Sequence, residues 1–410
     1  MKINLAYKFR LYPDEEQAQN LKQKAGNCRF VWNKLLADSN HHKEQTGRFL
    51  TRTQLEEIEK GLRSEHDFLK LSYSQSTQYQ CNTLDKAVKK AFSPYIVEQR
   101  KAALKKAYQE PDLAKQSKKV AKAFKLGFPK FKKKHDFRDS VHHPQHFKIQ
   151  KARIKIPKLG WVRFRKHREI VGVAKNVTLA QEGDQWFIAI CCDKEIEPKP
   201  PSVENVIGVD VGLKEFAVFS DGTKIVNPRL YRKAEAKIKR VQRQLSKMKN
   251  TVDVLEPDST EPNTFVQKKK QNQRKLAKQK KLAKLHRKVR NKRKDFLHQL
   301  THRMIAKYDG FVLEDLSSKN MMQNHKLAKS IGDASWSMFA RFLEYKCFWH
   351  GKHFEKIDRW CPTSQICHRC KHRQPMPLSE RVYDCGGCGI KIDRDLNASL
   401  NIIAFSSLGK

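Results

Sequence analysis

Two Cys-x-x-Cys pairs near the C-terminal end constrain the fold of this chain most strongly. Cys367 and Cys370 form the first pair, and Cys385 and Cys388 form the second pair after fourteen residues. Each pair can offer two thiolates, and four thiolates make a closed tetrahedral zinc site. Two disulfides or four incidental cysteines are the alternative. Because a closed site has no open coordination position, we predict a structural Zn²⁺ ion that fixes the D-R-D segment following the second pair.

The charge of the chain restricts its partners. Lys and Arg total 85 against 43 acidic residues, which gives a formal net charge of +42. A polyanion explains such an excess best, because neutralised phosphates release counterions and drive binding. An anionic membrane surface is the alternative, but no apolar run is long enough to span a bilayer, and the first residues lack the apolar core of a signal peptide. We therefore expect a nucleic-acid partner and no membrane.

Length and cysteine usage indicate the class of protein. A chain of 410 residues can bury a large core and should hold two or three domains. The cysteines outside the two pairs have no spacing typical of a disulfide framework. We therefore expect a reducing cytoplasm. These cysteines are Cys28, Cys81, Cys191, Cys192, Cys347 and Cys361.

The N-terminal third is predicted to be helical after one strand. Lys2–Leu11 alternates as a strand does, and Asp14 can cap a helix over Glu15–Lys24. A second helix is expected from Phe30. The two helices, joined near Gly26, could form a helix-turn-helix or could simply pack against each other.

A further helix is predicted over Ser74–Phe92, followed by a charged helical insertion over Lys101–Lys125. The first of these begins with Gln75, Gln78 and Gln80. These side chains could form a solvated face. They could also read a DNA base, because glutamine presents a donor and an acceptor to an adenine edge.

Short strands dominate from Phe147 to Glu195, with turn signals between them. This pattern predicts a small antiparallel sheet or barrel. Just before it, the segment from Gly127 mixes aromatic and basic residues, which suits contact with phosphates and bases. The proline-rich stretch Pro198–Ser202 is the clearest domain boundary.

Two long helices are predicted in the second half. Their apolar stripes run from Ile238 to Met248 and from Leu282 to Phe296, and the acidic loop Asp253–Pro262 between them predicts a helical hairpin. Lys268–Lys294 holds fifteen basic residues and no acid in 27 positions. A solvated face would suffer repulsion between like charges, so we favour a phosphate-facing helix. The candidate contacts are Arg274, Lys275, Lys278, Arg287 and Arg290.

Acidic residues recur next to predicted buried strands. Asp210 lies in the strand Val206–Gly212, Glu314 lies near the end of Gly310–Leu316, and Asp395 precedes the last helix. A three-stranded meander, a helix, a strand and a helix follow one another in the RNase H-like fold. Carboxylates that converge in such a fold hold two Mg²⁺ ions about 3.5–4 Å apart, one activating water and the other stabilising the leaving oxygen of a phosphodiester.

Over nearly its full length, the chain resembles TnpB, the RNA-guided DNA endonuclease family of insertion-sequence transposons, which is related to type V CRISPR effectors. The motifs that match in order are Phe9-Arg-Leu-Tyr-Pro13, Gly127-Phe-Pro-Lys-Phe131, Lys158-Leu-Gly-Trp161, Gly208-Val-Asp-Val-Gly212, Thr363-Ser-Gln-Ile-Cys-His-Arg-Cys370 and Asp393-Arg-Asp-Leu-Asn-Ala398.

The resemblance implies roles for individual residues. Asp210, Glu314 and Asp395 would fill the RuvC-type catalytic positions and bind Mg²⁺, with Asp393 as support. Cys367, Cys370, Cys385 and Cys388 would bind Zn²⁺. Lys371 and Ser399 depart from the family pattern, but neither replaces a catalytic acid.

The resemblance also implies a multidomain α+β architecture, with a β-barrel wedge domain, an inserted helical recognition lobe, a RuvC-like nuclease domain and an inserted zinc ribbon that binds target nucleic acid. The expected partners are a guide RNA from the transposon end and a double-stranded target DNA, bound by a monomeric protein in a prokaryotic cytoplasm. The expected segments are 1–12 and 126–200 for the wedge, 13–125 for the recognition lobe, 201–360 and 393–410 for the nuclease domain, and 361–392 for the zinc ribbon.

The predicted function is RNA-guided DNA cleavage. The protein would read a short motif beside the target, RNA–DNA pairing would read the rest, and DNA strands would be hydrolysed at one site. An RNA-guided repressor that binds without cleavage and a strand-transfer transposase are the alternatives, because fold alone does not separate them.

Overall fold

The computed structural model describes residues 1–410 except 134–138, 198–199, 201–202, 258–264, 378 and 409–410. Over residues 252–271 it describes only the backbone, outside the gap at 258–264. The chain divides into two compact units, Lys2–Glu195 and Ile196–Lys410, with Met1 joining the second unit. No helix in the described part of the chain is long and apolar enough to cross a membrane.

A seven-stranded antiparallel sheet forms one part of the Lys2–Glu195 unit, in the order β2-β6-β7-β1-β5-β4-β3. The predicted N-terminal strand is confirmed and pairs along its length with the last strand of the unit. Alternate residues point into a core that contains Phe9, Phe164 and Ile188. The strands are β1 (Lys2–Tyr12), β2 (Ser140–His143), β3 (Lys148–Gln150), β4 (Arg153–Ile156), β5 (Gly160–Phe164), β6 (Val173–Glu182) and β7 (Gln185–Glu195).

Helices fill the sequence between β1 and β2. The longest, α1, begins at the predicted cap Asp14, which forms a reciprocal capping box with Gln17. It ends at Gly47, whose φ of 75° is in the left-handed region. The helices are α1 (Glu15–Thr46), α2 (Arg52–Glu65), α3 (Asp67–Lys70), α4 (Ser74–Ala91), α5 (Pro94–Tyr108) and α6 (Leu113–Phe124).

The predicted break near Gly26 is wrong, because α1 runs through it without interruption. A glycine within a helix costs only about 1 kcal/mol relative to alanine. Leu21, Cys28 and Leu35 are all buried and recur every seven residues, so one apolar stripe continues across the glycine. Packing along this stripe outweighs the local penalty.

A five-stranded mixed sheet forms the centre of the Ile196–Lys410 unit, in the order β10-β9-β8-β13-β14. The first three strands form the predicted antiparallel meander, while β13 runs parallel to both β8 and β14. Asp221 and Gly222 make the turn that joins two strands of the meander, and Gly222 has a φ of 83°. The strands are β8 (Val206–Val211), β9 (Glu215–Phe219), β10 (Lys224–Val226), β13 (Gly310–Glu314) and β14 (His353–Ile357).

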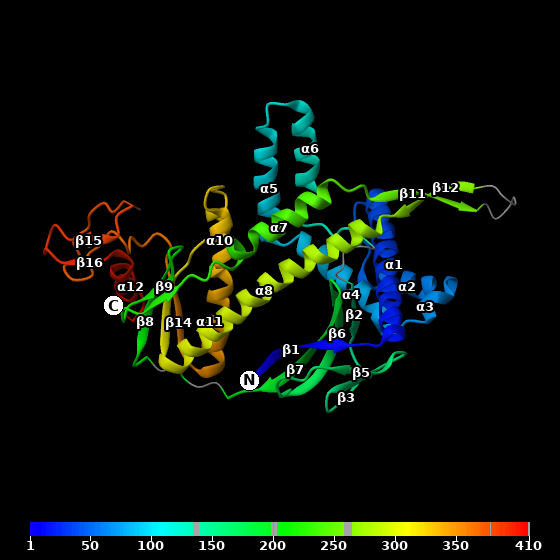
Figure 1. The fold of residues 1–410 in the computed structure, drawn as a ribbon, viewed down its shortest axis with the longest axis horizontal. Helices are drawn as coiled ribbons and strands as arrows, with labels where there is room; N and C mark the ends of the chain where they lie inside the picture. Colours follow the sequence, from blue (N-terminus) through cyan, green and yellow to red (C-terminus); the bar gives the residue numbers. More distant parts are fainter. Residues whose placement is uncertain (134–138, 198–199, 201–202, 258–264, 378, 409–410) are drawn as a thin grey trace. The chain divides into compact units, whose positions relative to one another are not determined.

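Helices cover this sheet. Leu297 on α8 and Phe339 on α11 join Phe216 and Phe311 of the sheet in one buried core. In Figure 1, α7 and α8 run side by side. The helices are α7 (Leu230–Ser246), α8 (Gln273–Lys307), α9 (Ser318–Met321), α10 (Ala328–Ala334), α11 (Trp336–His350) and α12 (Arg394–Ala404).

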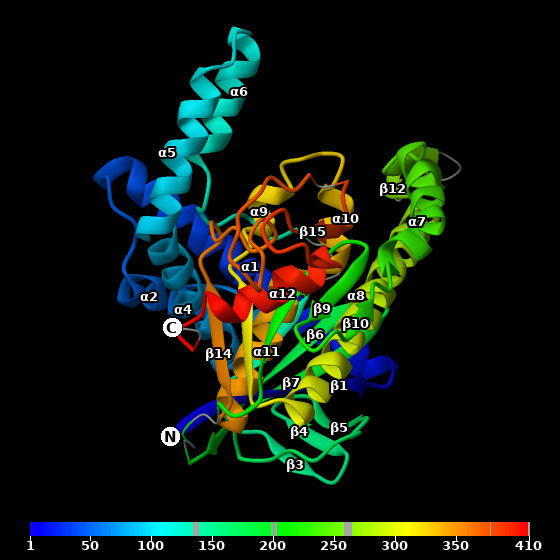
Figure 2. The same ribbon diagram turned by 90° about the vertical axis from the view of Figure 1, so that its left-hand side faces the viewer.

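The last helix, α12, lies directly against β8 (red helix in Figure 2). A Cβ atom added to Gly208 on β8 would lie 2.0 Å from the backbone oxygen of Ser399 on α12. Only glycine therefore allows the strand and the helix to approach this closely.

The two predicted long helices pack against each other, but a strand pair takes the place of the predicted loop between them. β11 (Thr251–Pro257) pairs antiparallel with β12 (Phe265–Gln271) between α7 and α8. The predicted loop Asp253–Pro262 is a strand as far as Pro257, and its remainder lies outside the described residues. Valines at 252 and 254 alternate with polar residues, which is the period of a strand, whereas the acids and prolines of the same segment favour a loop.

Candidate functional site

Asp210 and Glu314 lie side by side on neighbouring parallel strands. β8 and β13 are in register with Val209 opposite Leu313, so the next residue on each strand is the acid. Asp395 lies in the first turn of α12, the helix that packs against β8. The structure thus brings the three predicted acids from distant parts of the sequence to one end of the sheet.

The charges of these acids interact. Burial, followed by the charges of Glu314 and Asp395, raises the pKa of Asp210 to about 8. Burial also raises the pKa of Glu314, against a hydrogen bond from Thr363 that lowers it. A site of this kind favours a bound proton or cation, because ionised carboxylates in a poorly solvated region repel one another.

Two further residues contact these acids. Thr363 Oγ1 donates a hydrogen bond of 2.5 Å to Glu314 Oε1. The guanidinium of Arg381 lies 3.8 Å from Asp395 Oδ1. Neither role was predicted from the sequence, although Thr363 opens one of the motifs that matched the TnpB pattern.

Asp393 has a different environment from Asp395. It is the N-cap of α12, and its Oδ1 accepts hydrogen bonds from the backbone N–H groups of Asp395 at 2.9 Å and Leu396 at 3.2 Å. Its Oδ2 accepts a hydrogen bond of 2.6 Å from Lys224 Nζ. Although partial burial favours the protonated form, Lys224 and the cap together lower the pKa of Asp393. Asp393 therefore acts as a helix cap that is already neutralised by a lysine.

The four predicted zinc ligands meet in one cluster. Their sulfur atoms all lie within 4.8 Å of one another, with Cys367 Sγ 3.7 Å from Cys388 Sγ and Cys370 Sγ 3.5 Å from Cys385 Sγ. Zn–S bonds of about 2.3 Å in a tetrahedron place sulfur atoms roughly 3.8 Å apart, so these thiols fit one zinc ion. Among the described residues, no other group of three or more His, Cys, Asp or Glu side chains is this close, and Asp210, Glu314 and Asp395 are more widely spread.

Two buried asparagines on α12 hold the chain that enters this cluster. Asn397 Oδ1 accepts a hydrogen bond of 3.0 Å from the backbone N–H of His368, and its Nδ2 donates to Ile366 O at 2.7 Å. Asn401 Nδ2 donates to Ile366 O at 2.6 Å and to Thr363 O at 2.9 Å. Asparagines four residues apart on an otherwise apolar helix face are the sequence signal that could have revealed this link.

The cluster itself is stabilised by a short strand pair, β15 (Val382–Asp384) with β16 (Lys391–Asp393). β16 leads directly into α12. Tyr383 of β15 is fully buried, and its hydroxyl lies 3.2 Å from Gln365 O and 3.1 Å from His372 O. The cysteine cluster, the asparagines and Asp395 therefore belong to one continuous piece of structure.

The three glutamines that were predicted to read a DNA base differ in exposure. Gln80 is buried, its Nε2 donates to Ser76 O, and its Oε1 accepts from Lys132. Gln75 accepts a hydrogen bond of 2.8 Å from the Tyr73 hydroxyl. The structure thus argues against Gln80 as a base contact.

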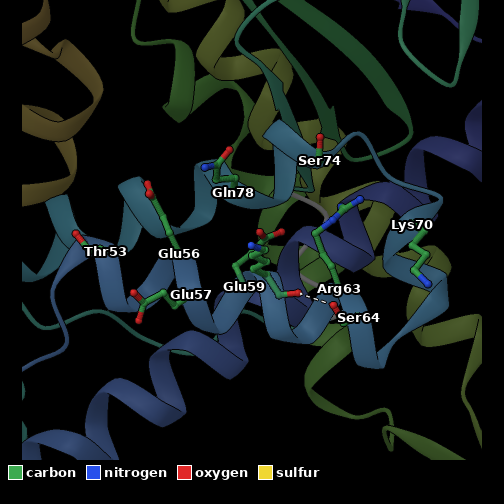
Figure 3. Close-up of a pocket in the computed structure, with 10 residues that line it drawn as sticks. Thr53, Glu56, Glu57, Glu59, Arg63, Ser64, Lys70, Ser74 and Gln78 are labelled. Atoms are coloured by element: carbon green, nitrogen blue, oxygen red, sulfur yellow. Dashed lines mark hydrogen bonds between the residues drawn. The ribbon is translucent and has the colours of Figure 1, made fainter.

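Gln78 is the exposed glutamine of the three. Figure 3 shows it on α4 beside a pocket that Glu56 and Arg63 of α2 also line. This pocket has a volume of about 580 Å³.

The predicted basic contacts on α8 also differ in exposure. Arg274 and Arg290 are exposed. Lys275 Nζ donates to Met248 O at 2.6 Å, and Lys278 Nζ donates to Gln244 Oε1 at 2.8 Å. Arg287 is only 8% exposed, so its side chain is directed into the protein rather than toward a ligand in solvent.

Three family models match the chain. The model "Probable transposase" matches residues 189–253 and 259–325, a "Helix-turn-helix domain" model matches 1–48, and a "Cas12f1-like, TNB domain" model matches 336–402. A relative from Streptomyces pristinaespiralis, named as a candidate RNA-guided DNA endonuclease, is 30% identical over 98% of this chain and 89% of its own length. The chain belongs to the TnpB family.

Other TnpB relatives agree. The Escherichia coli K12 protein InsQ, also named as a candidate RNA-guided DNA endonuclease, is 30% identical over 98% of this chain and 92% of its own length. A TnpB-like protein of Methanocaldococcus jannaschii is 25% identical over 52% of this chain. A solved Cas12f1–sgRNA–target DNA complex aligns over 98% of this chain and 98% of its own chain, at 15% identity and a TM-score of 0.34.

Proposed function

We propose that this TnpB protein is an RNA-guided DNA endonuclease that uses a guide RNA derived from its transposon, recognises a short motif beside the target, and hydrolyses DNA strands at one site formed by Asp210, Glu314 and Asp395. The observation that carries the proposal is the register of β8 and β13, which sets Asp210 beside Glu314 next to the first turn of α12. The names of the full-length relatives support the same activity.

The residues fit a pair of divalent cations. The pKa of Asp210, raised to about 8 by burial and by its acidic neighbours, indicates that negative charge accumulates here without enough compensation. We propose that Asp210, Glu314 and Asp395 would hold two Mg²⁺ ions, which when bound supply an activated water and stabilise the leaving oxygen of a phosphodiester.

Each neighbouring group then has a defined task. Thr363 fixes the orientation of the Glu314 carboxylate through its hydrogen bond. Asp393 holds the first turn of α12 by capping it, and its ion pair with Lys224 removes it from competition for a cation. We therefore assign the metal-binding role within D-R-D to Asp395.

We propose the same division of the chain that the family resemblance implies. The strand order β10-β9-β8-β13-β14, an antiparallel meander followed by two parallel strands, agrees with the RNase H-like sheet that the resemblance implies. It supports a RuvC-like nuclease domain over residues 201–360 and 393–410. The four-cysteine cluster supports a zinc ribbon over 361–392. The single sheet that joins β1 to β2–β7 supports a wedge domain, barrel-like in the family, interrupted by a helical recognition lobe over 13–125.

The test uses the full-length protein purified with its own RNA. After that RNA is sequenced, matching plasmid targets with randomised flanks are incubated with protein and Mg²⁺. We expect double-strand or single-strand cleavage, and loss of cleavage with retained target binding in Asp210→Ala, Glu314→Ala and Asp395→Ala. Retained cleavage in Asp395→Ala with loss in Asp393→Ala would reverse our assignment within D-R-D.

The same assay separates the alternatives. A repressor would bind the target without cleaving it, and a strand-transfer transposase would join DNA ends rather than release them. Because Asp210, Glu314 and Asp395 are all present, we favour a hydrolase over a repressor that only binds.

A further inference from the structure

A small cavity in the Lys2–Glu195 unit is surrounded by positive charge. It has a volume of about 270 Å³. Three lysines and two amides surround it, and no acid lines it. The lining residues are Asn20, Gln23, Lys24, Lys70, Leu71 and Lys158.

Lys24 is the unusual member of this set. It lies on α1 and is only 2% exposed, a burial that lysine rarely has. Its Nζ donates a hydrogen bond to the backbone oxygen of Lys158. A carbonyl oxygen satisfies one donor of an ammonium group but does not neutralise its charge, so the buried charge remains costly.

Lys158 brings a second positive charge to the same place. It lies in the turn between β4 and β5 with a φ of 58°, which is uncommon for a residue with a side chain. Its Nζ donates to the backbone oxygen of Lys70, so α1, the β4–β5 turn and the end of α3 are joined by lysine–carbonyl bonds. Burial and the charge of Lys158 together lower the pKa of Lys24 to about 8.

The charge of the third lysine, Lys70, is paired only with an exposed acid. Lys70 Nζ lies 2.6 Å from Asp67 Oδ1, and the side chain of that aspartate is 90% exposed. Exposed ion pairs of this kind contribute little, so the aspartate can be displaced. The three lysines carry like charges into one small cavity, so a bound anion would stabilise their charged forms.

We propose that this cavity, the Lys24 pocket, binds one phosphate group of a nucleic-acid backbone. A phosphate offers several acceptor oxygens to the remaining ammonium and amide donors, and it supplies the negative charge that the carbonyls lack. The nucleic-acid source of the phosphate depends on the proposed function, whereas the affinity of the pocket for a phosphate group does not. The contact would fix the helical segment and the β4–β5 turn on the backbone of the RNA or of the DNA.

The first experiment uses inorganic phosphate and the full-length protein freed of RNA. Phosphate should raise the melting temperature of the wild type, and this increase should be reduced in Lys158→Met. The Lys158 side chain is exposed, so the variant should still fold although it loses the hydrogen bond to Lys70 O, and the increase is measured against its own melting temperature without phosphate. Lys22→Met is the matched control, because Lys22 is an exposed lysine of α1 that does not line the pocket. An equal response in Lys158→Met and Lys22→Met would overturn the proposal.

The second experiment identifies the source of the phosphate. Binding of the co-purified RNA, and binding of a matching DNA duplex by the RNA-loaded protein, are measured over a range of salt concentrations. Lys24→Met and Lys158→Met should weaken one of these two equilibria roughly tenfold and lower its salt slope by about 1, while Lys22→Met changes it less than about twofold.

Each outcome has a distinct meaning. An effect on RNA binding assigns the pocket to the guide, and an effect on duplex binding assigns it to the DNA. If neither equilibrium changes more than in the control, the proposal is wrong. Because no arm measures cleavage, a protein that binds normally but does not cleave would contradict the proposed function and leave the Lys24 pocket intact.

Discussion

Thr363 Oγ1 and Glu314 Oε1 are joined by a hydrogen bond of 2.5 Å, which connects the segment entering the cysteine cluster to the end of β13. The backbone oxygen of the same threonine accepts a hydrogen bond of 2.9 Å from Asn401 on α12. One residue thus contacts a strand acid through its side chain and the last helix through its backbone. The segment that enters the cysteine cluster and the carboxylate site are therefore parts of one connected structure.

We predict that Thr363→Val lowers cleavage roughly tenfold, because a hydrogen bond to a charged group is worth about 1.5–3 kcal/mol. The measurement is the rate of target cleavage as a function of Mg²⁺ concentration. If Thr363 positions Glu314, higher Mg²⁺ should partly restore the cleavage rate of Thr363→Val. Thr363→Ser, which keeps the hydroxyl group, should cleave at nearly the wild-type rate. Equal losses in the Val and Ser variants would indicate a packing defect instead.

Gly208 is predicted to be intolerant of substitution. Its added Cβ would lie 2.0 Å from Ser399 O, so Gly208→Ala must push α12 away from β8. We expect a loss of about 1–3 kcal/mol in the free energy of unfolding and a larger loss of cleavage, since Asp395 moves with the helix. Gly61→Ala in α2 is the control. Nothing lies within 4 Å of its added Cβ, so it should be neutral or stabilising in thermal melts.

Zinc is predicted to be structural. Metal analysis should find about one zinc per chain, because four thiolates make one tetrahedral site. Cys388→Ser should lower both the melting temperature and the cleavage rate, because β16 and α12 follow this cluster directly. Replacing the partly buried Cys191, which lies in the other unit of the chain, with Ser is the control and should change neither as much. A zinc-free protein with unchanged melting and full activity would contradict the prediction.

The sequence pointed to the cysteine cluster and to the buried acids because these signals are local or periodic. The cysteine spacing needs no knowledge of the fold, and the apolar strand around Asp210 already marks a buried acid. The link through Thr363 was missed because it joins residues 49 positions apart, and such contacts have no local signature. The helix break at Gly26 was wrong for a related reason: tertiary packing of α1 overrode a weak local preference.

The direction of the basic side chains on α8 and of the glutamines on α4 was the least predictable feature of the structure. Composition gives the charge of α8 but not the direction of each side chain, and Arg287 proved to be buried. Gln80 likewise faces the protein. Which polar residues face a ligand depends on the rotation of a helix against its neighbours, and that rotation is set by the whole core.

The Asp221 turn should make stability depend on pH. Although partial burial favours protonation, hydrogen bonds from Tyr308, Thr223 and Lys307 hold the pKa of Asp221 well below its ordinary range. An acid with a depressed pKa contributes stability above its unfolded pKa of about 3.9 and loses that contribution as the pH falls further. We expect Asp221→Asn to be about 1 kcal/mol less stable than wild type at pH 7 and the difference to shrink below about pH 4. Urea unfolding at both pH values is the measurement, and a difference that grows in acid would contradict the prediction.

Gln78 is predicted to contribute to recognition of the target-adjacent motif. Phosphate contacts carry no sequence information, so a protein this basic needs side chains that present a donor and an acceptor to a base edge. Gln78 is exposed on α4, whereas Gln80 is buried and engaged with Ser76 and Lys132. In cleavage of a library with randomised flanks, Gln78→Ala should relax the preference at one position by about 1–3 kcal/mol. Gln80→Ala is the internal control and should lower the melting temperature without changing the preference. An unchanged profile in Gln78→Ala would move motif recognition to another surface, first to the aromatic and basic segment that begins at Gly127.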